Sequence, residues 1–303
     1  MWMLQVPLSP LAAETLIKLL PLSMIMVHDN MSNSTGNGNA NRQYAIIARQ
    51  KDIGHVTVEK KRTIWKMGLP LIGQCRSFIR KKTEVAKLID CKKIWGTFKQ
   101  AYVGRDPCDV PPEAYDPLLN SVKDDAACNT MLFWSQTNAV VHAFTKNRDC
   151  LVTVEDTLLG FMFKGLTWCS KNESKETFTT GCPDWSGCKN SPIQSFWLKA
   201  SANFATTGCG KVSVMLNGSL DTPFNSSSIF ASVEVKKLDP NKVEGLTILL
   251  VTNNTDSTTC KNPSFNNLKS SLNEKIAYYC REVPYFRVAG CISDLKIPCS
   301  DCL

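Results

Sequence analysis

The cysteines constrain the fold of this chain more than any other residue type. Its 303 residues include 14 cysteines, all between Cys75 and Cys302. Their spacing is irregular, with a lone CxxC formed by Cys299 and Cys302, and the 3 histidines are scattered along the chain. Zinc sites need cysteines or histidines paired at short spacing, so we expect no metal. The pattern indicates a disulfide framework formed in an oxidising compartment.

The N-terminal part has a different character. Residues 1–27 are apolar overall, but Glu14 and Lys18 interrupt them and no basic residue precedes them. A signal peptide, a membrane anchor and a start-site error all stay open for this segment, and membrane association stays open with them. Residues 28–71 include an Asn- and Gly-rich stretch at 30–41, which cannot bury enough apolar surface to offset its ordering entropy. We expect 28–71 to be a flexible linker.

Asn-X-Ser/Thr sequons agree with an extracellular protein, either secreted or membrane-anchored. The glycosylation candidates are Asn172, Asn217, Asn225 and Asn253, and two further sequons begin at Asn30 and Asn33. The formal net charge of +8 comes from basic residues spread along the chain. Because they form no long stripe interleaved with aromatic residues, we expect solvated faces and no nucleic-acid partner. A mildly positive surface also favours the approach of a small anionic substrate.

Hydrophobic periodicity divides the cysteine-containing part into two regions. Steps of three and four residues predict helices within 72–127 and 152–207, which we group as a helical lobe. Strand-like runs at 129–134, 211–216, 232–235 and 246–251, with a helical pattern at 268–279, place 128–151 and 208–303 in an α/β lobe. The order predicts an α+β fold with a short parallel sheet and a cleft between the lobes.

Two adjacent acids, Glu155 and Asp156, stand at the head of an apolar run. Thr153 or Thr157 can cap a helix here, and acids in a first turn suit the positive end of the helix dipole. The same carboxylates can instead line a pocket. Taken alone, the segment favours the capping interpretation.

Several short motifs, and their order along the chain, resemble those of the ADP-ribosyl cyclase / cyclic ADP-ribose hydrolase family. The motifs are DCKKIW (90–95), DPC (106–108), LFWS (132–135), LVTVEDTLLG (151–160), TWC (167–169), CPDW (182–185), SFW (195–197), VMLNGS (214–219) and FASVE (230–234). Each motif alone is weak, but so many in order across 75–299 make the resemblance specific. It implies cleavage of the nicotinamide–ribose bond of NAD+, giving nicotinamide with ADP-ribose or cyclic ADP-ribose. NAD+ is then a substrate, and no cofactor is implied.

The resemblance implies that Glu234 is the catalytic carboxylate. Nicotinamide leaves a cationic pyridinium as a neutral molecule, so the reaction needs no acid to protonate the leaving group. It needs a carboxylate that stabilises an oxocarbenium-like ribose or traps it covalently. Spacing alone favours another interpretation, in which Glu234 faces outward from a strand between Val233 and Val235.

The resemblance also implies a set of substrate-binding residues. Trp134 and Trp197 match tryptophans at the mouth of the family's pocket, where indole faces suit a pyridinium ring; core packing is the alternative for both. Glu155 and Asp156 match an acidic pair at the nicotinamide end, and Ser135 and Phe230 match positions near the phosphates and ribose. Core packing is our expectation for three other tryptophans, namely Trp95, Trp168 and Trp185.

Two positions depart from the family's pattern and bear on product choice. The family includes a mammalian cell-surface enzyme and a soluble mollusc enzyme. Gln136 stands where the mammalian enzyme carries an arginine, which weakens one phosphate contact or moves it elsewhere. Ile229 stands where that enzyme has threonine and the mollusc enzyme has phenylalanine. NADP+ and cyclic ADP-ribose stay open as further substrates.

The resemblance further suggests the disulfide pairing. The expected bridges are Cys75–Cys91, Cys108–Cys188, Cys128–Cys209, Cys169–Cys182, Cys260–Cys280 and Cys291–Cys299. Cys150 and Cys302 are left over. Three alternatives are open for these two cysteines: they pair with each other, they stay free, or they link two chains as a homodimer. In a fourth alternative, Cys302 takes the place of Cys299 in the bridge to Cys291.

A different class of function remains as the alternative. A secreted or cell-surface recognition module could keep the disulfide scaffold without turning over a substrate. The presence of Glu234 and both pocket tryptophans argues against it.

Overall fold

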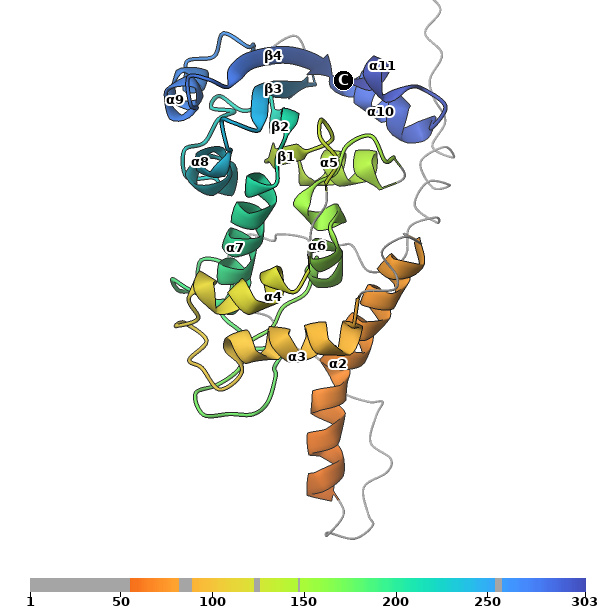
Figure 1. Ribbon diagram of the computed structural model, residues 1–303, viewed down its shortest axis with the longest axis vertical. Helices are drawn as coiled ribbons and strands as arrows, with labels where there is room; N and C mark the ends of the chain where they lie inside the picture. The colour runs from red at the N-terminus through yellow and green to blue at the C-terminus, as the bar shows by residue number, and fades with distance from the viewer. Residues whose placement is uncertain (1–54, 82–88, 123–125, 147, 254–257) are drawn as a thin grey trace, which may run out of the picture. The chain divides into compact units, whose positions relative to one another are not determined.

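The structure is a computed structural model, and Figure 1 shows its ribbon. It describes residues 55–81, 89–122, 126–146, 148–253 and 258–303. The predicted apolar segment 1–27 and most of the predicted linker lie outside these ranges. Helix α2 (His55–Lys81) contradicts the rest of the linker prediction, because it begins before residue 71 and buries Met67 and Leu71. Those two apolar side chains pack into the core, which a flexible linker would not allow.

Four parallel strands form the sheet, in the order β1-β2-β3-β4. They are β1 (Leu132–Ser135), β2 (Gly210–Asn217), β3 (Val243–Thr252) and β4 (Ala277–Pro284). The sheet confirms the predicted α+β class with a short parallel sheet. The predicted helix at 268–279 is wrong in its second half, because α9 (Ser264–Ser271) ends early and the chain turns into β4. Tyr278 and Tyr279 suit a strand, and they pair with Leu246 and Thr247 of β3.

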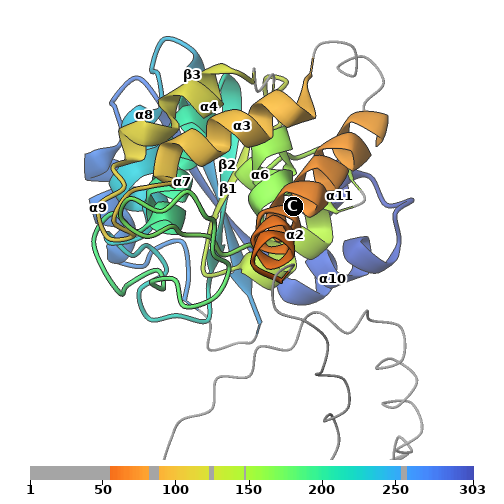
Figure 2. The ribbon, with the colours of Figure 1, turned by 90° about the horizontal axis from the view of Figure 1, so that it is seen from below.

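Apolar side chains cover both faces of the central strands. On β3, Leu246, Ile248 and Leu250 join the larger core, whereas Leu249 and Val251 join a second core on the opposite face. The second core also holds buried residues of α5 (Asn138–Thr145), α10 (Tyr285–Ser293) and α11 (Cys299–Cys302). Figure 2 shows α9 on one side of the strands and α10 on the other. A parallel sheet covered on both faces explains the nearly continuous apolar run of β3.

Helices before and between the strands build the rest of the larger core. They are α3 (Cys91–Tyr102), η1 (Pro112–Tyr115), α4 (Asp116–Asn120), η2 (Val154–Asp156), α6 (Leu158–Phe163) and α7 (Pro192–Thr206). Side-chain caps explain where some of them begin: Asp90 accepts from the N–H groups of Lys92 and Lys93 at the start of α3, and Ser191 caps α7. Helix α2 packs against α3 and α6.

The segment predicted as a strand at 232–235 is helical. A π-helical turn, η3 (Phe230–Glu234), runs directly into α8 (Val235–Lys237). The backbone N–H of Ser232 donates to the carbonyl of Ser228, and the Ser228 side chain accepts from the N–H of Ala231. Burial of Phe230, Glu234 and Leu238 at four-residue steps fits a helix and not the alternation of a strand.

Seven disulfides join all 14 cysteines. All the expected bridges are present except Cys291–Cys299, which is wrong. Cys291 pairs with Cys302, and Cys299 pairs with Cys150. Cys302 is completely buried against α10, whereas Cys299 is half-buried and reaches the segment after α5.

All described residues belong to one compact unit, Asp52–Leu303. The partition into a helical lobe and an α/β lobe stays a prediction. Within the described ranges, no helix has the length and apolar character needed to cross a membrane.

Candidate active site

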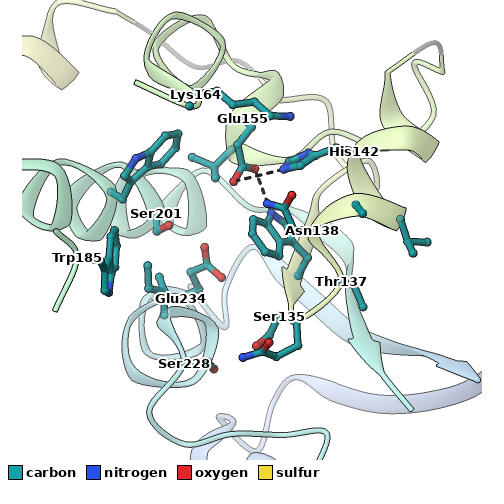
Figure 3. Close-up of a pocket in the computed structure, with 18 of the residues that line it drawn as sticks. Ser135, Thr137, Asn138, His142, Glu155, Lys164, Trp185, Ser201, Ser228 and Glu234 are labelled. Carbon is teal, nitrogen blue, oxygen red and sulfur yellow. Dashed lines mark hydrogen bonds and ion pairs between the residues drawn. The ribbon is translucent and has the colours of Figure 1, made fainter. Parts of the chain in front are cut away.

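A pocket of about 800 Å³ opens beyond the carboxyl end of β1. Its walls come from β1 and the turn after it, α5, η2, the residues after α6, the loop that holds Trp185, α7, residues 227–229 before η3, and Glu234 at the end of η3. The polar and aromatic lining residues include Trp134, Ser135, Gln136, Thr137, Asn138, His142, Glu155, Lys164, Trp185, Trp197, Ser201, Ser227, Ser228 and Glu234. Figure 3 shows Glu155 on one side of the pocket and Glu234 on the other.

Glu234 lies in the pocket with only 5% of its surface exposed. The π-helical turn η3 brings it there, and such turns are common at functional sites. Burial raises the pKa of Glu234 to about 8, a hydrogen bond from Ser201 of α7 opposes the rise, and the negative charge of Glu155 adds to it. The prediction of an outward-facing strand position is therefore wrong.

Glu155 lies in the pocket wall on η2 and is bound to Trp134. The indole N–H of Trp134 donates to Oε2 of Glu155 at 3.1 Å. Burial raises the pKa of Glu155, whereas this hydrogen bond opposes the rise. Gly160 lets α6 approach η2 closely, because a Cβ there would lie 1.8 Å from the carbonyl oxygen of Val154.

Asp156 is not among the described residues that line the pocket. Its carboxylate accepts from the backbone N–H of Thr153 at 3.0 Å and from the Thr153 hydroxyl at 2.8 Å. Thr157 in turn caps α6 by accepting from the N–H of Gly160. The two interpretations of this acidic pair therefore separate: Asp156 takes part in capping and Glu155 faces the pocket.

Trp134 of β1 and Trp197 of α7 both line the pocket and are half-buried. Trp185 also lines the pocket and is 40% exposed, so the expectation of core packing for Trp185 is wrong. Trp168 is completely buried, and Trp95 packs against the larger core, as expected. The loop holding Trp185 lies between Cys182 and Cys188, which two different disulfides anchor.

The remaining predicted site residues divide between pocket and core. Ser135 lines the pocket at the end of β1. Phe230 does not line it; its ring is buried against those of Phe133 and Phe224. Ile229 lines the pocket instead, and so does Gln136, whose backbone has a φ of 59°. This left-handed conformation turns the chain sharply from β1 towards α5.

Two ionisable residues that the sequence did not predict, His142 and Lys164, also line the pocket. Nε2 of His142 lies 4.0 Å from Oε1 of Glu155. Burial and the positive charge of Lys164 together lower the pKa of His142 to about 4, against a smaller opposing effect of Asp156. The imidazole is therefore neutral at pH 7 and forms no ion pair. The one sequence feature that could have indicated a pocket position for His142 is its place shortly after the strand-like run that became β1.

The asparagines of the candidate sequons differ in accessibility. Asn172, Asn225 and Asn253 are exposed, and Asn217 is half-buried. Asn30 and Asn33 lie outside the described residues.

A sequence model of the ADP-ribosyl cyclase family matches residues 67–300. The rat protein named ADP-ribosyl cyclase/cyclic ADP-ribose hydrolase 1 is 38% identical over 233 residues, covering 75% of this chain and 77% of the rat protein. The mouse protein of the same name is 36% identical over 231 residues, covering 75% of both chains.

Solved structures show the same fold. Porcine CD38 with a covalent intermediate, ribo-F-ribose-5'-phosphate, aligns with a TM-score of 0.68 and 33% identity, covering 72% of this chain and 96% of that one. Aplysia cyclase with substrate NGD and product cGDPR aligns with a TM-score of 0.66 and 25% identity, covering 76% and 94%. The chain belongs to the ADP-ribosyl cyclase family of enzymes.

Proposed function

We propose that this enzyme cleaves the nicotinamide–ribose bond of NAD+, releasing nicotinamide together with ADP-ribose, cyclic ADP-ribose or both. The observation that carries the proposal is the convergence of Glu234, Glu155 and Trp134 on one pocket from three separate elements. The names of the relatives agree with this activity. NAD+ is the substrate, and the reaction requires no bound cofactor.

Glu234 acts on the ribose. As the bond to the pyridinium nitrogen breaks, both electrons go to nitrogen and positive charge develops on the sugar. An ionised Glu234 stabilises that charge from a buried position, where electrostatic interactions are stronger than in water. The covalent intermediate named for porcine CD38 is compatible with direct attack by a carboxylate at this position.

The bound substrate itself promotes ionisation of Glu234. In the empty pocket burial raises the pKa of Glu234 to about 8, so the carboxyl group is mostly protonated at pH 7. A pyridinium cation placed nearby favours the charged carboxylate and lowers this pKa. The catalytic anion therefore forms when the cationic substrate is present.

Glu155 and the tryptophans hold the base. Oε1 of Glu155 can accept the carboxamide N–H while Trp134 keeps Oε2 in place. The indole faces of Trp134 and Trp197 suit a flat cationic ring, with an attraction of about 1–2 kcal/mol where water is excluded. Ser135 and Ser228 lie nearer Glu234 in Figure 3, which suits the ribose and pyrophosphate. Asp156 supports Glu155 through η2 and makes no contact with the substrate.

The compartment follows from the disulfides. Seven bridges persist only where thiols are oxidised, so we propose an extracellular catalytic domain. Exposed Asn172, Asn225 and Asn253 are then candidates for glycosylation.

Nicotinamide release from NAD+ tests the proposal. We expect the wild-type protein to turn over NAD+ and Glu234→Gln to lose at least about a hundredfold in kcat. Glu244→Gln, at an exposed position on β3, is the matched control and should keep full activity. Chromatography of the second product separates ADP-ribose from cyclic ADP-ribose. A wild-type protein without turnover would indicate the silent recognition module, and an active Glu234→Gln would remove Glu234 from catalysis.

A further inference from the structure

Helix α5 forms one wall of the pocket, and separate contacts hold its two ends. Its first residue, Asn138, lines the pocket. Just before that turn, the hydroxyl of Thr137 donates to the carbonyl of Met215 on β2 at 3.0 Å. At the other end, the backbone N–H of Arg148 donates to the carbonyl of Thr145, the last residue of α5. The position of this wall therefore depends on what holds Arg148.

Arg148 joins the end of α5 to the C-terminal segment, which we define as residues 285–303. Its side chain is only 8% exposed, and Nη2 donates to the carbonyls of Cys291 at 2.6 Å and of Asp294 at 2.8 Å. Nη1 donates to the carbonyl of Ile297 at 2.8 Å. The last carbonyls of a helix have no partner within the helix and form its negative end. The guanidinium supplies both the missing donors and the opposite charge at the end of α10.

Two further contacts hold the C-terminal segment against α5. Helix α10 packs against α5 (Figure 1), and Phe144 of α5 shares the second core with Val288 of α10. The Arg148 guanidinium lies 5.5 Å from the centre of the Phe144 ring. The bridge Cys150–Cys299 is covalent, and Nη1 of Arg148 lies 3.7 Å from Sγ of Cys299. Apolar packing, a disulfide and a buried cation thus meet at the end of α5.

The buried charge of Arg148 has no acidic partner. The ion pairs found in the described part of the chain do not include it. A buried cation is costly to desolvate, and an apolar side chain of similar size could pack against Phe144 without that cost. The guanidinium adds direction, because its planar fork reaches several carbonyls at once. We therefore expect Arg148 to fix the position of α5 more than to increase stability.

We infer that Arg148 is a positioning residue, which fixes the α5 wall of the pocket by binding the C-terminal segment. The inference rests on the proposed function for its effect on the reaction. Glu234 and Ser201 lie on η3 and α7, which are separate elements from α5. Loss of the Arg148 side chain should therefore loosen a wall that contacts the bound substrate and leave the chemical step intact.

Steady-state kinetics with NAD+ test the inference. We expect Arg148→Met to raise KM about fivefold and to change kcat by less than about twofold, because binding is weakened and Glu234 keeps its surroundings. Arg148→Lys keeps the charge but offers one ammonium in place of the planar fork, so its KM should lie between those of Arg148→Met and the wild type. An unchanged KM in Arg148→Met overturns the inference, and so does a loss that falls on kcat alone.

Two control variants separate positioning from general stability. Arg287→Met removes an exposed arginine from α10 and should match the wild type in both KM and Tm. Leu268→Ala removes a completely buried side chain from α9, which contributes no described residue to the pocket and lies across the sheet from α10 (Figure 2). It should lower Tm by several degrees and leave KM unchanged well below the transition. An equal rise of KM in Leu268→Ala and Arg148→Met would overturn the inference, because lost stability alone would explain it.

Hydrogen exchange followed by mass spectrometry separates this inference from the proposed function, because it requires no substrate. In Arg148→Met we expect exchange to accelerate about tenfold in a peptide covering 138–145 and to stay at the wild-type rate in a peptide covering 264–271. If Arg148→Met does not fold, Arg148→Lys provides the same comparison with a smaller difference. If the difference appears but the wild type does not cleave NAD+, the proposed function fails and the positioning role stands. If NAD+ is cleaved and neither KM nor exchange changes, only the positioning role fails.

Discussion

The indole N–H of Trp134 donates a hydrogen bond of 3.1 Å to Oε2 of Glu155, joining β1 to η2 across the pocket wall. The two residues are distant in the chain, so the fold and not sequence proximity brings them together. The hydrogen bond directs one carboxylate oxygen towards Trp134 and leaves the other available to the pocket. The position of Glu155, which we propose binds the base, therefore depends on the position of Trp134 on β1.

Trp134→Phe keeps an aromatic ring and removes the hydrogen-bond donor. We expect kcat/KM for NAD+ to fall about tenfold, because Glu155 loses a hydrogen bond to a charged group. Trp95→Phe is the control, since Trp95 lies outside the pocket lining and should show wild-type kinetics. Equal kinetics for Trp134→Phe and the wild type would show that the hydrogen bond does not matter for catalysis.

The activity should depend on pH through Glu234. Because burial raises the pKa of Glu234 to about 8 in the free enzyme, kcat/KM for NAD+ should rise with pH up to about 8 and then level off. The profile of kcat should rise at lower pH, because the bound pyridinium lowers the same pKa. A kcat/KM profile that is flat between about pH 6 and about pH 9 would contradict the assignment.

The same pKa makes Glu234 costly for stability. In the unfolded chain the carboxyl group titrates near 4.5, whereas in the folded protein its pKa is about 8. The folded state therefore holds a proton that the unfolded state has lost, and stability falls as pH rises between these two values. We expect Glu234→Gln to raise Tm by a few degrees at about pH 8.5 and much less at about pH 5, as measured by calorimetry. A Tm difference that is the same at both pH values would rule out this linkage.

Gly160 should be intolerant of any side chain. A Cβ at this position would meet the backbone of Val154 and of Glu155, so Gly160→Ala must shift α6 away from η2. We expect a loss of about 3 kcal/mol in unfolding free energy together with reduced activity, because Glu155 moves with η2. Gly73→Ala in α2 is the control, since nothing lies within 4 Å of its added Cβ. Denaturant unfolding compares the two, and similar stabilities would refute the packing argument.

The disulfide pairing can be read from peptides of the unreduced protein. Mass spectrometry should find Cys150 joined to Cys299 and Cys291 joined to Cys302. Strong reductant should lower Tm and abolish activity, because bridges that close long loops each contribute about 3–5 kcal/mol in the chain-entropy model. Peptides joining Cys291 to Cys299 would restore the original expectation, and a protein unaffected by dithiothreitol would not depend on its disulfides.

Local features of the fold and site could be predicted from the sequence because they depend on neighbouring residues. The apolar runs that became β1, β2 and β3 lie where their patterns indicate, and Thr153 and Thr157 act as caps within a few residues of the groups they bind. The ordered motifs carried the family assignment, including Glu155 and Trp134. The segment 232–235 shows the limit of such patterns, because valines on either side of Glu234 fit a strand as well as a helical turn.

The sequence by itself determined that the chain has a disulfide-linked α+β fold and belongs to a family whose motifs include an acidic and aromatic pocket. Only the tertiary structure decided which cysteine meets Cys299, since the separations from Cys291 to Cys299 and to Cys302 are both short, whereas Cys150 is distant in the chain. It likewise decided that Lys164 and His142 line the pocket and that Phe230 does not. The physical reason is that a pocket forms from side chains on separate elements, and their convergence depends on packing that no local pattern encodes.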